Sequence, residues 1–151
     1  MPPQTPVVVA IAVLVQDQRW LLQLRDDDPA IVAPGCWGLF GGHLEPRETP
    51  LEALSRELQE EIGHVPSGLQ LWYRSTDPSR IRHVFHASLR LPLSDLRLAE
   101  GQDLVLAEVQ TIASGLVWSP RLQEHRPLAP SLLEALGRWQ QEAGAVFPDG
   151  F

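Results

Sequence analysis

The chain has few of the features that would assign it to a secreted or membrane class. Its one cysteine, Cys36, cannot form an internal disulfide, so nothing marks the chain as a disulfide-stabilised secreted protein. No Cys-His signature accompanies Cys36, and we interpret it as a packed or half-exposed thiol rather than a nucleophile. The apolar run over residues 7–15 is far too short to span a bilayer.

Targeting signals and a basic surface are also lacking. No basic segment precedes residues 7–15 and no small-residue cleavage site follows them, so we expect a cytoplasmic protein with no membrane partner. The formal net charge is −7, whereas a duplex nucleic-acid binder needs a basic surface. A phosphate substrate remains compatible with this charge, because a divalent cation can lie between an acidic protein and a polyanion.

The length favours one domain. A chain of 151 residues fits a single hydrophobic core, and the sequence holds no repeat, low-complexity tract or long linker. We therefore predict a single domain over residues 1–151, in which residues 1–6 form a flexible, frayed end.

Hydrophobic patterning predicts an α/β fold. Residues 7–15 are apolar without alternation, which indicates a strand buried on both faces. Residues 26–35 are rich in aspartate and also hold prolines and a glycine, so they indicate a loop. Strands and two helices in this order predict a mixed β-sheet sandwiched between α-helices. The other predicted strands cover residues 19–24, 37–40, 69–74, 80–91 and 104–109, and the predicted helices cover residues 49–63 and 130–143.

The first predicted helix carries its own start and stop signals. Thr49 is a good N-cap, Pro50 suits the first helical position, and Glu52 completes a capping box with Thr49. Gly63 suits the C-terminal stop. An apolar stripe then recurs at helical spacing, formed by Leu51, Leu54, Leu58 and Ile62.

Three glutamates lie beside that stripe. Glu57, Glu60 and Glu61 fall within an arc of about 100° on a helix, where unpaired carboxylates repel one another and cost stability. Divalent cations lower that cost, and Mg²⁺ in particular bridges carboxylates to substrate phosphates. Taken alone, the glutamates would more simply indicate a solvated acidic face. Glu48, just before the helix, can project toward the same end.

The wider stretch resembles the Nudix box of the Nudix hydrolase family. That box reads Gly, five residues, Glu, seven residues, then Arg-Glu-aliphatic-any-Glu-Glu-any-Gly-aliphatic. Its seven invariant positions would match by chance on the order of 10⁻⁹ times per start position. His64 is the one departure, because the family has an aliphatic residue there, and it bears on local packing more than on metal binding. The matching residues are Gly42, Glu48, Arg56, Glu57, Leu58, Glu60, Glu61 and Gly63.

Flanking residues extend the resemblance. Trp37 followed closely by Gly41-Gly42 is typical of the entry to the box, although Phe40 replaces the common proline. The strand that ends in residues 21–25 is also similar to the family. Outside residues 21–64 the resemblance is one of layout, and it implies the Nudix fold over about residues 7–143.

The resemblance implies a role for each residue of the site. Glu57, Glu60 and Glu61 would be metal ligands together with the Gly41 carbonyl, and Glu57 would occupy a position that serves as general base in some members. Arg56 would hold the glutamates by salt bridge and belongs with them in the catalytic set. Glu48 would be a structural or outer carboxylate. Further candidates are Arg25, Gly41 and Gly42 for substrate binding and Glu100 as an additional metal ligand.

The implied function is a metal-dependent pyrophosphohydrolase. Such an enzyme cleaves the diphosphate linkage of a nucleoside diphosphate-linked small molecule by attack of water on phosphorus, with Mg²⁺ as cofactor and Mn²⁺ as an alternative. Nucleoside triphosphates, nucleotide sugars, dinucleoside polyphosphates and capped RNA ends all remain open as substrates. The coenzyme A and NADH subfamily signatures are not met. The oligomeric state is also open, with a homodimer among the options.

Two other functions use the same scaffold. A ligand-binding sensor need not keep all the acids of the box and would be expected to carry an appended DNA-binding domain, so an enzyme is favoured. A Nudix-fold isomerase would need further catalytic Cys and Glu positions that the sequence does not offer.

Several other candidate sites have simpler explanations. His83 and His86 point to opposite faces of a strand, so a shared zinc ion is not expected. Packing is the better explanation for most tryptophans, although Trp72 or Trp118 could stack on a base. The face shared by Arg82, His86 and Arg90 could touch a phosphate, but a solvent-facing strand surface is favoured.

Overall fold

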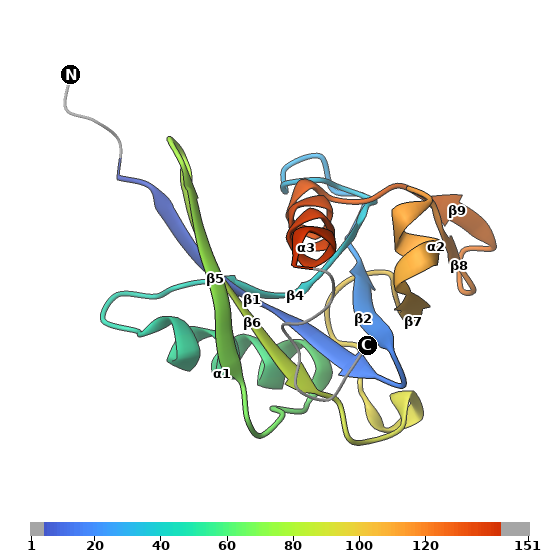
Figure 1. Ribbon diagram of the computed structural model, residues 1–151, viewed down its shortest axis with the longest axis horizontal. Coiled ribbons are helices and arrows are strands. Elements are labelled where there is room, and N and C mark those ends of the chain that lie inside the picture. Colours follow the sequence, from blue (N-terminus) through green and yellow to red (C-terminus); the bar gives the residue numbers. More distant parts are fainter. Residues whose placement is uncertain (1–4, 143–151) are drawn as a thin grey trace.

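The structure is a computed structural model that describes residues 5–142 (Figure 1). Residues 1–4 of the predicted frayed end, and Ala143 at the predicted end of the last helix, lie outside the described residues. In the described part of the chain, no helix is long and apolar enough to cross a membrane. The elements are the strands β1 (Val7–Gln16), β2 (Arg19–Leu24), β3 (Trp37–Gly38), β4 (Phe40–His43), β5 (Gln70–Asp77), β6 (Arg80–Ser88), β7 (Asp103–Glu108), β8 (Val117–Ser119) and β9 (Glu124–Arg126), the helices α1 (Pro50–Ile62), α2 (Val109–Ala113) and α3 (Pro130–Gln141), and the 3₁₀ turn Leu93–Asp95.

Within residues 5–142, seven strands form one mixed sheet in the order β3-β2-β1-β6-β5, with β4 added to β1 and β7 added to β2. β1 and β6 are parallel from Val7↔Arg80 to Val15↔Ser88, and the other pairs are antiparallel. The strands β8 and β9 form a separate hairpin.

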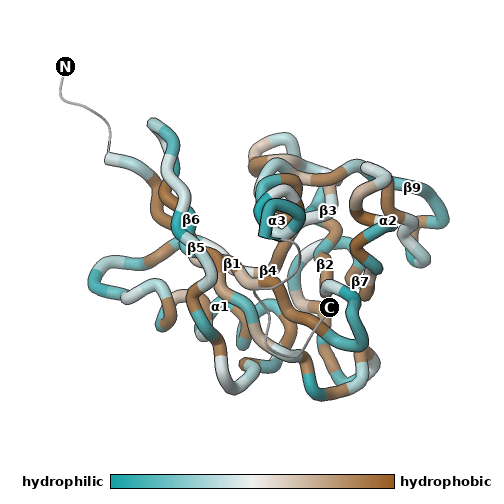
Figure 2. The backbone as a smooth tube through the Cα atoms, in the orientation of Figure 1, coloured by the Kyte–Doolittle hydropathy of each residue, from teal (hydrophilic) through white to brown (hydrophobic). Residues whose placement is uncertain are grey.

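Both faces of β1 are buried, as its uninterrupted apolar sequence predicts. Ile11 and Val13 belong to a core shared with α2 and α3, whereas Ala10, Ala12 and Leu14 belong to a core shared with α1. The tube in Figure 2 shows apolar strands lying between α1 on one side and α3 on the other. The predicted mixed sheet between helices is therefore confirmed.

Helix α1 begins and ends as predicted. Thr49 accepts a hydrogen bond from the backbone N–H of Glu52, whose side chain accepts one from Thr49 in return. Gly63 caps the C-terminus with a φ of 69°. Leu54, Leu58 and Ile62 are fully buried in the α1-side core. The prediction is wrong only for Leu51, which lies in the first turn of the helix and is 45% exposed.

The predicted strand over residues 37–40 is in fact two strands with a break at Leu39. β3 pairs with β2 through Gln23↔Gly38, whereas β4 pairs with β1 through Ala12↔Phe40. The chain changes partner at this point, so β1 borders β4 along its first half and β2 only at its end. The sheet therefore opens between β2 and β1.

Two further predictions needed correction. The strand at residues 80–91 ends at Ser88, and its partner extends to Asp77 rather than Arg74. The face shared by Arg82, His86 and Arg90 is only partly solvent-facing, because His86 is 8% exposed whereas Arg90 is exposed. The short elements α2, β8 and β9 were not predicted, since each is too short to show a period.

Candidate active site

Helix α1 and strand β4 place two glutamates against two glycines. Glu57 and Glu61 lie one turn apart on α1, and β4 runs alongside that helix. The backbone N–H of Gly41 donates to Oε1 of Glu61 at 2.9 Å. A Cβ on Gly42 would lie 2.5 Å from the carboxyl carbon of Glu57. The two glycines therefore bring backbone up to both carboxylates.

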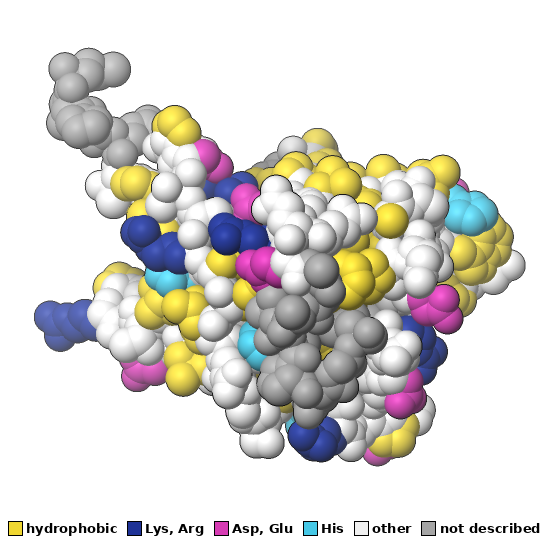
Figure 3. Space-filling model, in the orientation of Figure 1, with side chains coloured by type: hydrophobic (Ala, Val, Ile, Leu, Met, Phe, Trp, Pro, Cys, Tyr) yellow, Lys and Arg dark blue, Asp and Glu magenta, His cyan; other side chains and the backbone are white. Residues whose placement is uncertain are grey.

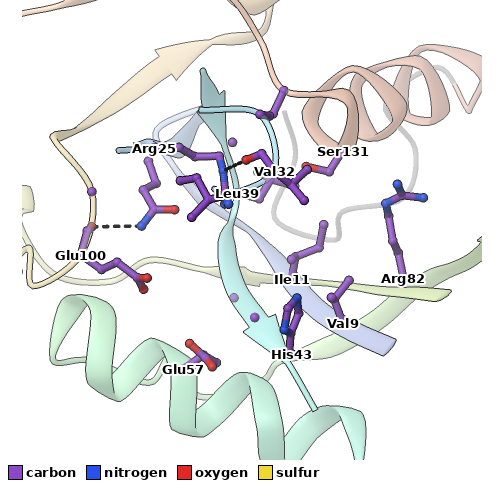
Figure 4. A pocket seen from close by; sticks show the side chains of 18 of the residues that line it. Val9, Ile11, Arg25, Val32, Leu39, His43, Glu57, Arg82, Glu100 and Ser131 are labelled. Carbon is purple, nitrogen blue, oxygen red and sulfur yellow. Dashed lines mark hydrogen bonds between the residues drawn. The ribbon is translucent and has the colours of Figure 1, made fainter. Parts of the chain in front are cut away.

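A third carboxylate arrives from the segment before β7. The N–H of Ala99 donates to the backbone carbonyl of Glu61 at 2.8 Å, and Nε2 of Gln23 donates to the carbonyl of Glu100 at 3.0 Å. These contacts hold Glu100 between α1 and β2, and Figure 4 shows its side chain on the same side of the cavity as Glu57. Carboxylate oxygens of Glu57, Glu61 and Glu100 all lie within 4.8 Å of one another.

Burial makes this cluster hard to ionise by itself. Glu61 is 3% exposed, and desolvation, together with the neighbouring Glu100 carboxyl, raises its pKa from 4.5 to about 9. Desolvation also raises the pKa of Glu57. Three clustered carboxylates, one of them buried, fit a hard divalent cation, which prefers oxygen ligands and supplies the missing positive charge.

Arg56 holds the acids from outside the cavity. Its Nε and Nη2 donate to the two carboxylate oxygens of Glu48 at 2.8 and 2.9 Å, and its Nη1 donates to Oε1 of Glu57 at 3.0 Å. Hydrogen bonds from Arg56 lower the pKa of Glu48 to about 2. Nη2 also donates to the carbonyl of His43 at 3.0 Å, which ties β4 to the helix. This is the salt-bridge arrangement that the sequence predicts for Arg56 and Glu48.

Glu60 lies apart from the cluster. It is exposed, and its Oε2 is 3.5 Å from Nη1 of Arg56. The predicted metal-ligand role of Glu60, and that of the Gly41 carbonyl, stay predictions. The structure brings Glu100, the additional candidate, together with Glu57 and Glu61 instead.

A cavity of about 650 Å³ opens beside the acids (Figure 4). Arg25, Gly41 and Gly42, the predicted substrate-binding residues, all line it. Val9, Ile11 and Leu39 form an aliphatic wall. The volume suits a small-molecule ligand, for which pockets are typically about 300–1,000 Å³.

The structure places several other candidate residues relative to the cavity. Arg82 lines the cavity, where an ordinary surface arginine was favoured, and its strand partner position on β1 is Val9. In the described part of the chain, Trp72 and Trp118 are absent from the cavity lining. Trp72 donates to Glu142 at 2.9 Å, and Trp118 packs edge-on against His125.

Half-buried His64 replaces an aliphatic residue, and the next residue, Val65, packs against the α1-side core.

Comparison with known proteins agrees with this geometry. The sequence profile described as "NUDIX domain" matches residues 4–120, which is more than half of the chain. The chain belongs to the NUDIX family. The matched range includes α1 with its glutamates and the Gly41-Gly42 segment.

Two NUDIX relatives are similar over much of the chain. An ADP-ribose pyrophosphatase of Methanocaldococcus jannaschii is 33% identical over 105 residues, which cover 68% of this chain and 60% of that protein. The human 8-oxo-dGDP phosphatase NUDT18 is 30% identical over 142 residues, which cover 91% of this chain and 40% of that protein. The chain therefore spans about half the length of these relatives.

Solved structures share the fold. A MutT NUDIX hydrolase from Burkholderia pseudomallei aligns with a TM-score of 0.68 at 24% identity, covering 89% of this chain and 98% of that one. This likeness confirms the predicted α/β Nudix fold.

Proposed function

We propose that this chain is a divalent-metal-dependent hydrolase of a phosphoanhydride bond in a nucleoside diphosphate-linked small molecule. The observation that carries the proposal is the meeting of Glu57, Glu61 and Glu100 within 4.8 Å beside a cavity of about 650 Å³. Membership of the NUDIX family and the activities named for its relatives support the same class of reaction.

The three carboxylates differ in burial, and we assign them different roles on that basis. Glu61 is buried and anchored to the Gly41 N–H, so it is a fixed ligand. Glu57 and Glu100 are the more open members of the cluster, and either can accept a proton from an attacking water. A Mg²⁺ or Mn²⁺ ion bound to this set would supply positive charge against the phosphate oxygens and lower the pKa of a water.

The rest of the cavity binds the substrate. Arg25 donates from Nε to the carbonyl of Val32 at 2.7 Å, which holds its guanidinium in the cavity wall, where it can contact a phosphate. The aliphatic wall of Val9, Ile11 and Leu39 suits the organic part of a nucleotide. A nucleotide substrate also fits a cytoplasmic location, which we retain as part of the proposal.

The test is a substrate screen. ADP-ribose, 8-oxo-dGDP, nucleoside triphosphates, nucleotide sugars and dinucleoside polyphosphates would each be incubated with the protein in Mg²⁺ or Mn²⁺, and the nucleotide products would be separated and quantified by anion-exchange chromatography. We expect turnover of at least one compound, its loss in EDTA and its recovery with added metal. A Glu61→Gln protein purified in parallel controls for contaminating phosphatases. Tight binding of a nucleotide without hydrolysis would instead indicate a sensor, and full turnover in EDTA would sink the metal mechanism.

A further inference from the structure

The loop between β2 and β3 forms one wall of the cavity. It leaves the sheet after Arg25 and returns at Cys36, where the N–H of Arg25 donates to the carbonyl of Cys36 at 2.9 Å. The N–H of Gly35 donates to the carbonyl of Asp26 at 2.9 Å and closes the neck of the loop. The loop residues that line the cavity are Asp26, Ala30, Ile31, Val32 and Ala33.

Little apolar packing holds this loop in place. Residues 26–30 are all exposed, and Val32 is 52% exposed. Contacts within the loop are short-range, such as the hydrogen bond from the N–H of Ala30 to the Asp28 side chain at 2.9 Å. Without a packed core of its own, the position of the loop must depend on the polar contacts that tie it to the rest of the fold.

Arg126, at the end of β9, clamps the neck of the loop from both sides. Its Nη1 donates to Oδ1 of Asp27 at 3.0 Å and to the carbonyl of Gly35 at 3.2 Å. Its Nη2 donates to Oδ2 of Asp27 at 3.4 Å. Glu124 aims the guanidinium, because its Oε1 accepts from Nε at 2.8 Å and from Nη2 at 2.6 Å.

The surroundings are shaped for this arginine. A Cβ on Gly35 would lie 2.6 Å from Nη1 of Arg126, so only glycine leaves room for the guanidinium. The side chain of Arg126 is 21% exposed, and hydrogen bonds from it lower the pKa of Asp27. The planar guanidinium can reach carboxylate and carbonyl oxygens on both sides of the neck at once, which a lysine ammonium cannot do.

The same arginine lies next to a second piece of the cavity wall. Immediately after Arg126, the carbonyl of Pro127 accepts from the N–H of Trp37 at 2.9 Å, and the N–H of Ala129 donates to the carbonyl of Trp37 at 2.7 Å. Ala129 and the start of α3 also line the cavity. Arg126 therefore links the β2–β3 loop to the segment that leads into α3.

We propose that Arg126 is a positioning residue, which acts through Asp27 and Gly35 to hold the β2–β3 loop as the substrate-binding wall of the cavity. Arg126 itself is not among the cavity-lining residues within the part of the chain that the structure describes. It therefore sets the affinity and selectivity for the organic part of the substrate, whereas the glutamates set the rate of the chemical step. This assignment rests on the proposed function for its kinetic consequence, but the clamp on the loop has a readout of its own.

The kinetic test compares Arg126→Gln, Arg126→Lys and Asp27→Asn with the parent protein on its best substrate. We expect Arg126→Gln and Asp27→Asn each to raise KM by about tenfold or more with little change in kcat, since a displaced wall loses contacts that bind the substrate equally in the ground state and the transition state. The double variant should have a KM no higher than that of the worse single variant, because both changes remove the same Arg126–Asp27 contact. Arg126→Lys should recover part of the affinity. A fall in kcat at unchanged KM, or additive effects of the two changes, would overturn the proposal.

A matched control and a second readout separate this role from a merely structural one. Arg19→Gln removes another Arg–Asp contact, the 3.9 Å pair with Asp17 in the β1–β2 turn, and should change neither KM nor kcat. Ion pairs whose carboxylates are exposed, as those of Asp27 and Glu124 are, contribute little to global stability, so the melting temperature of Arg126→Gln should stay near that of the parent. Hydrogen–deuterium exchange of residues 26–36 should accelerate in Arg126→Gln while exchange in α1 is unchanged. Unchanged exchange in the loop would refute the clamp even if turnover is found, whereas absence of turnover in the parent would refute the proposed function and leave the exchange result decisive for the clamp.

Discussion

Neighbouring glycines at the start of the site, Gly41 and Gly42, are needed for different reasons. Gly41 has a φ of 137°, and a side chain there would meet the backbone of Ala10 and Ile11. Gly42 has no positive φ, and the atoms nearest to a Cβ placed on it all belong to the carboxyl end of Glu57, a flexible side chain. Gly41 is thus required by the fold, and Gly42 by the placement of the Glu57 carboxylate.

Alanine substitutions should separate these two roles. Gly41→Ala should lose more than about 1 kcal/mol of unfolding free energy, because alanine is strained at positive φ and the backbone of β1 cannot move aside. Gly42→Ala should keep its stability but lose about a hundredfold in rate, since displacing Glu57 by about 1 Å misaligns the site. Thermal melting in EDTA and initial rates in Mg²⁺ measure the two effects. Equal loss of stability in both variants would contradict this division.

The buried Glu61 carboxyl predicts how metal-free stability varies with pH. Its pKa is raised in the folded state, from 4.5 to about 9, so the folded protein binds more protons than the unfolded chain between these values. Its stabilising contribution is therefore complete below about pH 4.5 and is lost as the pH rises through about 9. The raised pKa of Glu57 acts in the same direction.

Glu61→Gln tests this linkage. In EDTA the free energy of unfolding of the parent protein should fall as the pH rises, by at most about 1.4 kcal/mol per pH unit for one proton. Its melting temperature should fall with it. Glu61→Gln should make that slope shallower, leaving the part due to Glu57, and should lose about a hundredfold in rate, as expected when one strong electrostatic group is removed from a site. Glu108→Gln, an exposed change in β7, should keep the parent slope because Glu61 is intact. An early-melting Glu61→Gln with near-normal turnover would make the glutamate structural.

At the scale of elements, α1 contributes residues both to the hydrophobic core and to the candidate site. Its buried face contributes Leu54, Leu58 and Ile62 to the core beneath the sheet, and Glu57 and Glu61 follow beside them on the same helix. The capping box and the Gly63 cap fix the length of the helix, and packing of the buried face fixes its rotation. The direction of the carboxylates is therefore set by the leucines next to them.

Leucine substitutions in α1 test which part of the stripe packs. Leu58→Ala should lose about 2–5 kcal/mol of unfolding free energy, because Leu58 is fully buried. Leu51→Ala should change it by less than about 0.5 kcal/mol, since an exposed substitution away from special features has little effect. Denaturant unfolding in EDTA compares the two, and folded Leu58→Ala should still turn over substrate. A similar cost for both leucines would mean that the first turn of α1 is covered in solution.

Another element-scale feature is the change of strand partner at Leu39. Because β3 pairs with β2 and β4 pairs with β1, the sheet opens beside the two glycines. The cavity lies in this opening, with residues of β1, β2 and β4 around it. The break in the strand is thus the reason that a binding space exists next to the acids.

At the scale of the whole molecule, charge is arranged locally rather than as one field. The formal net charge is −7, yet arginines line parts of the cavity, and Figure 3 shows basic and acidic side chains interspersed on the face drawn there. Arg82 illustrates the pattern, since its Nη1 lies 3.1 Å from Asp77 and 3.8 Å from Glu134. Such pairing leaves no continuous basic surface on the face drawn in Figure 3 of the kind that a long polyanion needs.

The sequence by itself determined the local parts of this protein. Caps, helical period and the spacing of Glu57 and Glu61 all lie within one short segment, where backbone hydrogen bonds and side-chain spacing act over a few residues. The burial of β1 on both faces was likewise predictable from the sequence, because an apolar run without alternation has no polar face to expose. The family follows from the same segment, since its motif is local.

Only the tertiary structure decided what meets across long separations in the chain. Glu100 joins the acids because Ala99 and Gln23 dock its loop, and Arg126 reaches Asp27 across 99 positions of sequence. Burial of His86 and exposure of Leu51 depend on which neighbours cover a face, and periodicity carries no information on that. These contacts arise from strand pairing and packing between segments far apart in the chain. Local sequence therefore could not predict the aliphatic wall or the Arg126–Asp27 contact, whereas the motif and its flanks predicted Arg25, Gly41 and Gly42 as residues of the cavity.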